Sequence, residues 1–214
     1  MSINFIAVLD HQHLENTIFL TSFAKSLSNL GDRKGIIIHG DSPYTDRLIQ
    51  TGIMREDAQI RATKDLNKRL IGLFADQGIP TIGIHGFQKE IVSIQNDEIV
   101  INKKKIKSLH HVPNLLLSCL ADANGSQRYI SLPRFSAALS NAYQDAEILL
   151  FSMNEKDEIL INDEQEILEW DAISEQIENE TLPGEFKSFG KRVKITTATD
   201  FANWPNLKKC TVIQ

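Results

Sequence analysis

Three consecutive isoleucines, Ile36–Ile38, constrain most strongly what this chain can fold into. A short run of β-branched residues without a polar member is typical of a strand buried on both faces, as in a parallel sheet covered by helices. A second apolar strand segment, 3–9, precedes it, and between the two lies a helical pattern from Leu14 to Leu30 that stops at Gly31. Strand, helix and strand in succession predict an α/β protein with a mostly parallel sheet.

The rest of the chain repeats this alternation of strand and helix. Apolar and polar residues alternate over 88–107 around Asn96 and Asp97, which predicts an antiparallel hairpin, and its basic run Lys103–Lys107 is expected to be a solvated strand without a function. Right-handed crossovers place helices on both faces of a parallel sheet, so we expect a three-layer αβα sandwich. The other expected helices are 44–53, 57–77, 113–120 and 135–143, and the other expected strands are 81–84, 148–151, 193–195 and 210–213.

Composition excludes several classes of function. A formal net charge of -5 leaves no basic face for a nucleic-acid backbone. The two cysteines, Cys119 and Cys210, lie far apart and encode neither a disulfide framework nor a zinc knuckle, which fits a reducing, cytoplasmic setting. No secretory signal opens the chain, and no apolar run reaches the ~18 residues of a membrane span. We therefore expect no nucleic-acid partner and no membrane insertion.

Polar residues follow four of the expected strands. They are Asp10–His13, His39–Ser42, His85–Gly86, and Ser152 with Asn154. The carboxyl ends of parallel strands meet at one edge of a sheet, where ligands of such proteins bind. The sequence therefore predicts a polar, histidine-rich crevice at this edge.

Two interpretations of the histidines concern hydrogen bonding. In the first, the rings of His39 and His85 form hydrogen bonds within the protein at the strand ends, which is the common state of a half-buried histidine. Alternatively, together with Ser42, they hold a small anionic or zwitterionic metabolite through the backbone amides of Gly40 to Ser42, at the start of a helix.

A third interpretation is a metal site. His11 and His13, with His39 or His85 and with Asp10, would supply imidazole and carboxylate ligands suited to zinc or another divalent ion. The sequence alone leaves all three interpretations open, and our site assignment includes no metal ligand.

Several ordered segments are similar to motifs of one enzyme family. His39–Pro43, inside the segment GIIIHGDSPYTDRLIQTG, resembles a strand, glycine loop and helix with the pattern His-Gly-Gly-Gly-Pro. Leu66–Lys68 and the later GIPTIGIHG look like a Val-Asn-Lys helix that leads into a strand closing with Ser-Gly. IKSLHHVPNLLLSCLADANG and SAALSNAYQDAEILLFS follow in the same order. Over roughly residues 1–155 the chain resembles the amino-acid kinase (aspartate/glutamate/uridylate kinase) family, and within it acetylglutamate kinase.

The resemblance implies an architecture and a set of site residues. It implies one domain over 1–214, with a substrate and dimerisation lobe at 1–120 and a shortened nucleotide lobe at 121–214. It also implies a homodimer, and ATP with Mg²⁺ as cofactors if the protein is active on a carboxylate. The positions that it implies for substrate are His39, Gly40, Asp41, Ser42, Arg55, His85, Gly86 and Ser131, and those for nucleotide are Ser152, Asn154 and Lys187.

The chain departs from the family where phosphate is handled. Val8–His11 stands at the position of Lys-x-Gly-Gly, so the cation and both glycines are missing. Asp41 and Ser42 replace two loop glycines, and an anionic Asp41 would repel a phosphate. Tyr129–Pro133 matches Asn-Ile-Asn-Ala-Asp but ends in proline, and Ser152–Met153 matches Thr-Asp. Phosphoryl transfer depends on positioning and on positive charge, and these substitutions remove both.

The sequence thus predicts a divergent, acetylglutamate-kinase-like protein with weak or no phosphotransfer that binds a small metabolite at the carboxyl edge. One alternative is an active kinase of an N-acylglutamate-type carboxylate that uses Lys68, Lys187 or Lys191 as replacement cations. The other is a divalent-metal-binding protein that uses the histidine-rich edge. No residue is assigned as catalytic, and the identity of the metabolite does not follow from the sequence.

Overall fold

The structure is a computed structural model that describes residues 3–31, 34–109, 114–152, 167–173, 181–187 and 189–214. Its main sheet has eight strands in the order β10-β12-β11-β9-β1-β2-β6-β3. Every neighbouring pair is parallel except β11 with β12. The strands are β1 (Phe5–Leu9), β2 (Gly35–His39), β3 (Thr81–His85), β6 (Asn114–Ser118), β9 (Glu147–Phe151), β10 (Ile167–Leu168), β11 (Val193–Thr196) and β12 (Cys210–Ile213).

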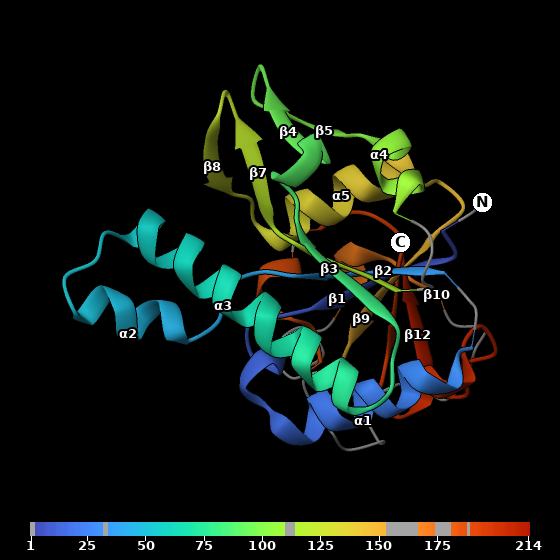
Figure 1. Cartoon of the computed structure of the whole chain (residues 1–214). Coiled ribbons are helices and arrows are strands. Elements are labelled where there is room, and N and C mark those ends of the chain that lie inside the picture. The colour runs from blue at the N-terminus through green and yellow to red at the C-terminus, as the bar shows by residue number, and fades with distance from the viewer. Residues whose placement is uncertain (1–2, 32–33, 110–113, 153–166, 174–180, 188) are drawn as a thin grey trace.

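A smaller sheet stands on one face of the main sheet (Figure 1). Its order is β5-β4-β7-β8, with β4 (Val92–Gln95), β5 (Glu98–Ile101), β7 (Leu120–Ala123) and β8 (Ser126–Tyr129). The turn at Asn96 and Asp97 has positive φ at both residues, and it joins β4 to β5 as an antiparallel hairpin. This confirms the hairpin expected from the alternating pattern.

Helices cover both faces of the main sheet, as the three-layer prediction requires. They are α1 (Thr17–Asn29), α2 (Tyr44–Gln50), α3 (Arg55–Asp76), α4 (Lys103–Ser108) and α5 (Leu132–Ala142). Figure 1 shows α1 and α3 below the sheet, and α5 and α4 above it beside the smaller sheet. Each face has its own core: Phe23 of α1 and Phe74 of α3 pack on one side, and Phe135 of α5 packs on the other. None of the helices in the described ranges is long and apolar enough to cross a membrane.

The helix expected at 113–120 is wrong. Residues 114–118 form β6, which pairs in parallel with β2 on one side and β3 on the other. Its three leucines, Leu115–Leu117, are all buried: Leu115 and Leu117 pack in the core on one face of the sheet, and Leu116 packs in the core on the other face. A short apolar run fits a buried strand and a buried helix equally well by pattern, so the neighbouring strands decide the outcome. The hairpin between β7 and β8 turns at Asn124 and Gly125, both of which have positive φ.

The basic run Lys103–Lys107 is also not a strand. It lies in α4, where the Asn102 side chain accepts a hydrogen bond from the Lys105 backbone N at 3.1 Å and caps the helix. Ile106 is fully buried under the helix, while the lysines before and after it are exposed. One buried residue fixes the face of this short helix, which is too weak a signal to read as helical periodicity.

Candidate functional site

The carboxyl ends of β1, β2, β6 and β3 lie side by side in the main sheet, because these strands are parallel neighbours. In Figure 1 this edge is on the left, where α2 begins. The residues at these ends are Asp10, His39, Ser118 and His85. β9 is the parallel neighbour of β1 on its other side, so Ser152 at the carboxyl end of β9 lies at the same edge. The structure therefore brings together all four of the predicted polar strand ends.

A hollow of about 350 Å³ opens at this edge, and we call it the carboxyl-edge hollow. Its volume is within the range of small-molecule sites. Segments distant in sequence form it: the loop after β1, the loop after β2 with the first turn of α2, the first residue of α3, and the 3₁₀ turn Gly184–Phe186. The lining residues are Asp10, His11, Gln12, Asp41, Thr45, Asp46, Arg55, Gly184 and Glu185.

Two polar side chains of the hollow are buried and incompletely hydrogen-bonded. Asp10 is 2% exposed, and its Oδ1 atom has no partner among the described residues, while its Oδ2 accepts only a long 3.5 Å hydrogen bond from the Gln12 backbone N. Thr45 is also 2% exposed, and its Oγ1 makes no hydrogen bond of good geometry to a described residue, although the hydroxyl is near enough to Asp41 to help lower the pKa of that carboxyl. A buried polar atom without a partner costs about 1–3 kcal/mol. In the described ranges the hydroxyls of Thr63, Ser136 and Thr181 are in the same condition, and they do not line the hollow.

Asp41 is the centre of a small polar cluster in the hollow. Its Oδ1 lies 3.7 Å from His11 Nδ1 and accepts a 3.4 Å hydrogen bond from the Tyr129 hydroxyl. Burial alone would raise the pKa of Asp41, but the His11 imidazole and the other polar neighbours outweigh burial and lower the pKa. In return, Asp41 raises the pKa of His11, with smaller contributions from Asp10 and Asp46 and against the effect of burial. Asp41 is therefore an anion at neutral pH, with His11 drawn toward the charged form.

Glu185 adds another carboxyl group to the same hollow. Burial of the carboxyl and, to a smaller extent, the negative charges of Asp10 and Asp41 raise its pKa to about 7, while His11 acts in the opposite direction. Glu185 as a residue is exposed, so solvent screens part of this repulsion. The hollow thus holds more acidic groups than its own cations balance.

His39, a predicted substrate residue, lies beneath the hollow and does not line it. It is fully buried, its Nδ1 is 2.9 Å from the carbonyl oxygen of Gly40, and its Nε2 is 2.9 Å from Asn67 Nδ2. These partners assign the proton to Nδ1, so that Nε2 accepts from the amide. Burial lowers the pKa of His39 to about 4. The ring is neutral and satisfied, as the hydrogen-bonding interpretation expects.

His85 is also satisfied at its strand end. Its Nδ1 is 3.0 Å from the hydroxyl of Ser118, and its ring stacks on Phe87. Burial lowers the pKa of His85, as do the nearby cations Lys64 and Lys68. Neither His85 nor Gly86 lines the carboxyl-edge hollow.

The loop after β2 differs from an anion-binding glycine loop. The backbone N of Asp41 donates to the Tyr129 hydroxyl at 3.4 Å, and the Ser42 hydroxyl accepts from the Tyr44 backbone N at 3.4 Å. A Cβ atom at Gly40 would come within 2.5 Å of the Tyr129 hydroxyl, so the glycine is required for this close packing. The loop therefore uses part of its donor and acceptor capacity internally.

The remaining predicted site residues are dispersed. Arg55 is exposed on the rim of the hollow, at the first residue of α3. Ser131 occupies the N-cap position of α5 without a side-chain hydrogen bond to the helix. Ser152 lies at the end of β9, where its carbonyl oxygen is 3.5 Å from His13 Nε2. Lys187 follows the Gly184–Phe186 turn, and Asn154 lies outside the described residues.

The structure does not favour the metal-site interpretation. Within the described ranges, no three side chains of histidine, cysteine, aspartate or glutamate come together in a way that could hold a metal ion. His13 is buried and stacks on Phe19 at 4.1 Å between ring centres, and its Nδ1 accepts from the Asp10 backbone N at 3.3 Å. His11, the remaining histidine of this group, faces Asp41.

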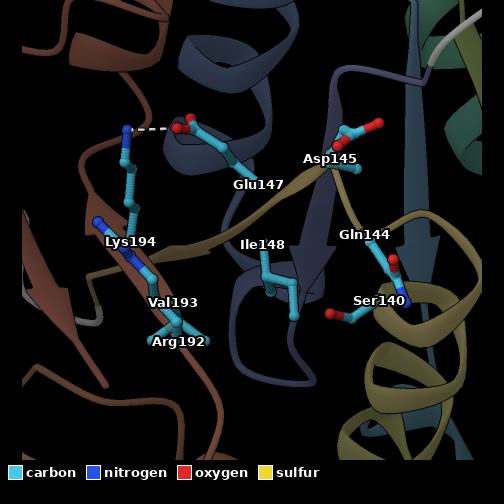
Figure 2. Close-up of a pocket in the computed structure, with 9 residues that line it drawn as sticks. Ser140, Gln144, Asp145, Glu147, Ile148, Arg192, Val193 and Lys194 are labelled. Carbon is cyan, nitrogen blue, oxygen red and sulfur yellow. Dashed lines mark hydrogen bonds and ion pairs between the residues drawn. The ribbon is translucent and has the colours of Figure 1, made fainter.

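A second hollow, of about 340 Å³, lies at the opposite edge of the sheet, where β9 and β11 begin (Figure 2). Glu147 and Lys194 form an ion pair across it at 2.6 Å, and the other Glu147 oxygen accepts from Trp204 Nε1 at 2.8 Å. Gln144 and Asp145 lie on the other side of this hollow from the pair. The partly buried carboxylate of this hollow, Glu147, thus has partners for both of its oxygens, in contrast to Asp10 in the carboxyl-edge hollow.

Sequence reasoning missed Thr45, Tyr129 and Glu185 as members of the site. Glu185 comes from a segment about 145 residues from Asp41, and no local pattern connects the two. Asp10 was placed at the predicted polar edge and considered as a metal ligand, but it was not assigned to the substrate site.

Comparison with known proteins places the fold. No sequence family and no curated protein matches the chain. Among solved structures, N-acetylglutamate synthase from Neisseria gonorrhoeae matches with a TM-score of 0.63 and 13% identity over 99% of this chain and 61% of the synthase. Isopentenyl phosphate kinase matches with a TM-score of 0.65 and 12% identity over 98% and 99% of the two chains. Aspartate kinase from Synechocystis matches with a TM-score of 0.64 and 11% identity over 98% and 40%.

These matches show the fold and leave the activity open. The chain spans about three fifths of the length of the synthase and nearly all of the isopentenyl phosphate kinase. Identities of 11–13% are too low to carry residue roles from one chain to another. At TM-scores of 0.63–0.65 over nearly all of this chain, the matches show that the chain shares the α/β fold of these kinases and this synthase.

Proposed function

We propose that this protein binds a small metabolite in the carboxyl-edge hollow and transfers little or no phosphoryl group. The observation that carries the proposal is the chemistry of the hollow's lining. Asp10, Asp41, Asp46 and Glu185 all line it, and two of the lining residues, Asp10 and Thr45, each have a buried side-chain oxygen without a well-formed hydrogen bond among the described residues. A polar hollow with unsatisfied buried groups is a candidate binding site on physical grounds.

The same lining argues against phosphoryl transfer. A transferring phosphoryl group needs cations and backbone amides around its oxygens. The family's lysine position holds Val8, which is fully buried in β1 and packed in the core. Beside the hollow, the Asp41 amide is engaged by Tyr129, and the Asp41 carboxylate is anionic. The donor set of the hollow therefore does not fit a nucleotide's phosphate group.

The fold itself is compatible with more than one reaction. Its structural neighbours include two kinases and a synthase solved with coenzyme A and L-arginine or with N-acetyl-glutamate. Function in such a case follows from the site and not from the fold. A homodimer, which the resemblance to the family implies, remains part of the proposal.

An assay of ADP release tests the catalytic half of the proposal. Purified protein is incubated with Mg-ATP and, in separate reactions, N-acetylglutamate, aspartate and isopentenyl phosphate, the compounds suggested by the structural neighbours. We expect no release above the background of a protein-free reaction. Sustained turnover that is lost on replacing Lys187 would establish the active-kinase alternative instead. Lys191 is the weaker replacement cation, because its Nζ donates to Asn141 Oδ1 on the exposed surface.

Thermal unfolding with a library of small metabolites tests the binding half. A ligand that binds only the native state raises the melting temperature by mass action. We expect at least one library compound to stabilise the wild type, and Thr45→Val, which removes the orphaned hydroxyl at similar volume, to lose that shift. Asp145→Asn, in the hollow of Figure 2, is the matched control and should retain the shift. If every stabilising compound acts equally on Thr45→Val, the carboxyl-edge hollow is not the binding site.

A further inference from the structure

We infer that the group held in the carboxyl-edge hollow is the primary ammonium of a small organic cation, bound by Asp10, Asp41 and Thr45. The inference rests on the proposed function, because it names the class of ligand for the same hollow. It goes further because the resemblance to a kinase family points to anionic phosphate and carboxylate groups at this edge.

The first argument is hydrogen bonding. Asp10 Oδ1 is an acceptor, it is buried, and it has no partner among the residues that the structure describes. Thr45 Oγ1 is a second buried atom without a well-formed hydrogen bond; its hydroxyl proton is oriented by Asp41 at most, and its oxygen still accepts through its lone pairs. A primary ammonium carries three N–H donors and no acceptor, so it complements these oxygens. A phosphate or carboxylate would bring further acceptors and leave Asp10 Oδ1 unsatisfied.

The second argument is charge. Four carboxyl groups line the hollow, and the cationic side chains in its lining are His11 and the exposed Arg55. Glu185 shows the effect of this crowding. Its pKa is raised to about 7 by burial and by the negative charges of Asp10 and Asp41. The pair of Asp41 and His11 neutralises only part of this charge. A ligand cation next to Asp10 would balance the remainder, whereas an anion would add to the repulsion.

The third argument separates ammonium from other cations. A divalent metal ion requires several convergent ligands, and the described residues contain no group of three that could hold one. A quaternary ammonium has the charge but no N–H donor, so it would leave the acceptors of Asp10 and Thr45 unpaired. A primary ammonium satisfies both the charge and the hydrogen-bonding requirement of the hollow.

Probes of similar size test the inference. Backbone amide resonances of the ¹⁵N-labelled protein are followed while n-butylammonium, tetramethylammonium or butyrate is added at constant ionic strength. We expect n-butylammonium to shift the amides of Asp10, Asp41 and Thr45 in a saturable way. Tetramethylammonium should bind at least ~10-fold more weakly, since it lacks the N–H donors, and butyrate should leave these amides unchanged.

Two variants connect the binding to the named atoms. Asp10→Asn keeps the shape but removes the anionic acceptor, and Thr45→Val removes the hydroxyl; each should weaken n-butylammonium by at least ~10-fold. Asp145→Asn, in the opposite hollow, serves as the carboxylate control and should bind the probe as the wild type does. The amide spectrum of each variant shows whether it is folded. If one of the two variants does not fold, the other still tests the inference.

The outcomes separate this inference from the proposed function. Equal binding of tetramethylammonium, binding of butyrate at the same amides, or undiminished n-butylammonium binding by both variants would each overturn the ammonium inference. If an anionic or neutral metabolite from the library shifts these amides and n-butylammonium does not, the inference fails while the proposed function stands. If neither the probes nor the library affects these amides, both fail. Competition by MgCl₂ at millimolar concentration that depends on Asp10 would indicate a metal site and would also overturn the inference.

Discussion

Buried polar side chains at the carboxyl edge are of two kinds, and the difference lies in their partners. His39 and His85 have hydrogen-bond partners on neighbouring segments, Asn67 and Ser118. Asp10 and Thr45 lie close by in the fold but retain an unpaired atom. A satisfied ring stabilises the sheet, whereas an unpaired acceptor reduces stability unless a ligand completes it. This contrast is the basis on which we propose a structural role for the histidines and a binding role for the hollow.

His39 should make the protein sensitive to acid. Its pKa is lowered to about 4 by burial, against 6.5 for the unperturbed group, so the unfolded chain binds the proton first. Stability is therefore lost as pH falls from about 6.5 to about 4, by up to about 3 kcal/mol at 1.36 kcal/mol per pKa unit. Urea unfolding at pH 7 and pH 4.5 measures the loss. In His39→Gln, which keeps an amide near Asn67, the pH dependence over this window should be smaller.

His11 and Asp41 add pH dependence on either side of this window. The pKa of His11 is raised, so its contribution is fully present below pH 6.5 and is lost as pH rises through its folded value. The pKa of Asp41 is lowered, so its contribution persists until pH falls through a value below 3.8. Comparison of His39→Gln with the wild type cancels both contributions. An unchanged pH slope in the variant would contradict the role of His39.

The smaller sheet is connected to the main sheet through close backbone packing at the end of β3. Gly86 accepts from the Val92 backbone N at 2.7 Å, and a Cβ atom at Gly86 would lie 2.3 Å from the carbonyl oxygen of Leu120. β4 and β7 therefore both approach the main sheet at this glycine. Gly86 is required because a side chain would collide with neighbouring backbone, and not because its φ is positive. The sequence alone does not distinguish these two reasons for a glycine.

Gly86→Ala should destabilise the protein by about 1–3 kcal/mol, because the added methyl group meets backbone that cannot move aside. Gly72 supplies the matched control: it lies inside α3, and a Cβ there meets nothing within 4 Å. Gly72→Ala should stabilise by about 0.5–1 kcal/mol, since alanine favours helix. Urea unfolding of both variants measures the difference. Equal effects of the two substitutions would show that the two sheets are not held by this contact.

At the scale of the whole molecule, one carboxylate joins the carboxy-terminal segments to the centre of the sheet. Glu147 begins β9 and contacts Lys194 of β11 through one oxygen and Trp204 through the other (Figure 2). Trp204 in turn packs against Phe5 of β1 at 5.2 Å between ring centres. A segment near residue 204 is thus fixed against the first strand of the chain.

Glu147→Gln should cost about 1 kcal/mol, because it weakens an ion pair and a hydrogen bond that are only partly exposed. Glu15→Gln is the control, since Glu15 pairs with Arg47 at a similar 2.7 Å but on the exposed surface. That substitution should change stability by less than about 0.5 kcal/mol. Thermal or urea unfolding, followed by tryptophan fluorescence, compares the two. A larger loss in Glu15→Gln than in Glu147→Gln would contradict this account.

Most strands and helices could be predicted because their signals are local. Ile36–Ile38 and the segment 3–9 are buried strands, and Gly31 and Gly78 end helices with positive φ. The periodicity of apolar residues and the residues that end helices are both properties of neighbouring positions, so the sequence contains these signals in full. The two errors, at Leu115–Leu117 and Lys103–Lys107, occur where the local pattern is short and the packing partner decides.

The sequence by itself determined the α/β class, the parallel sheet and the polar edge, because each depends on periodicity and on where strands end. Only the tertiary structure decided which polar residues form a site. It brought Glu185 and Asp41 into one hollow, satisfied His39 with Asn67 and left Asp10 Oδ1 without a partner among the described residues. Hydrogen-bond partners and charge environments arise between segments far apart in the chain, and a pattern of neighbours in the sequence contains no record of them.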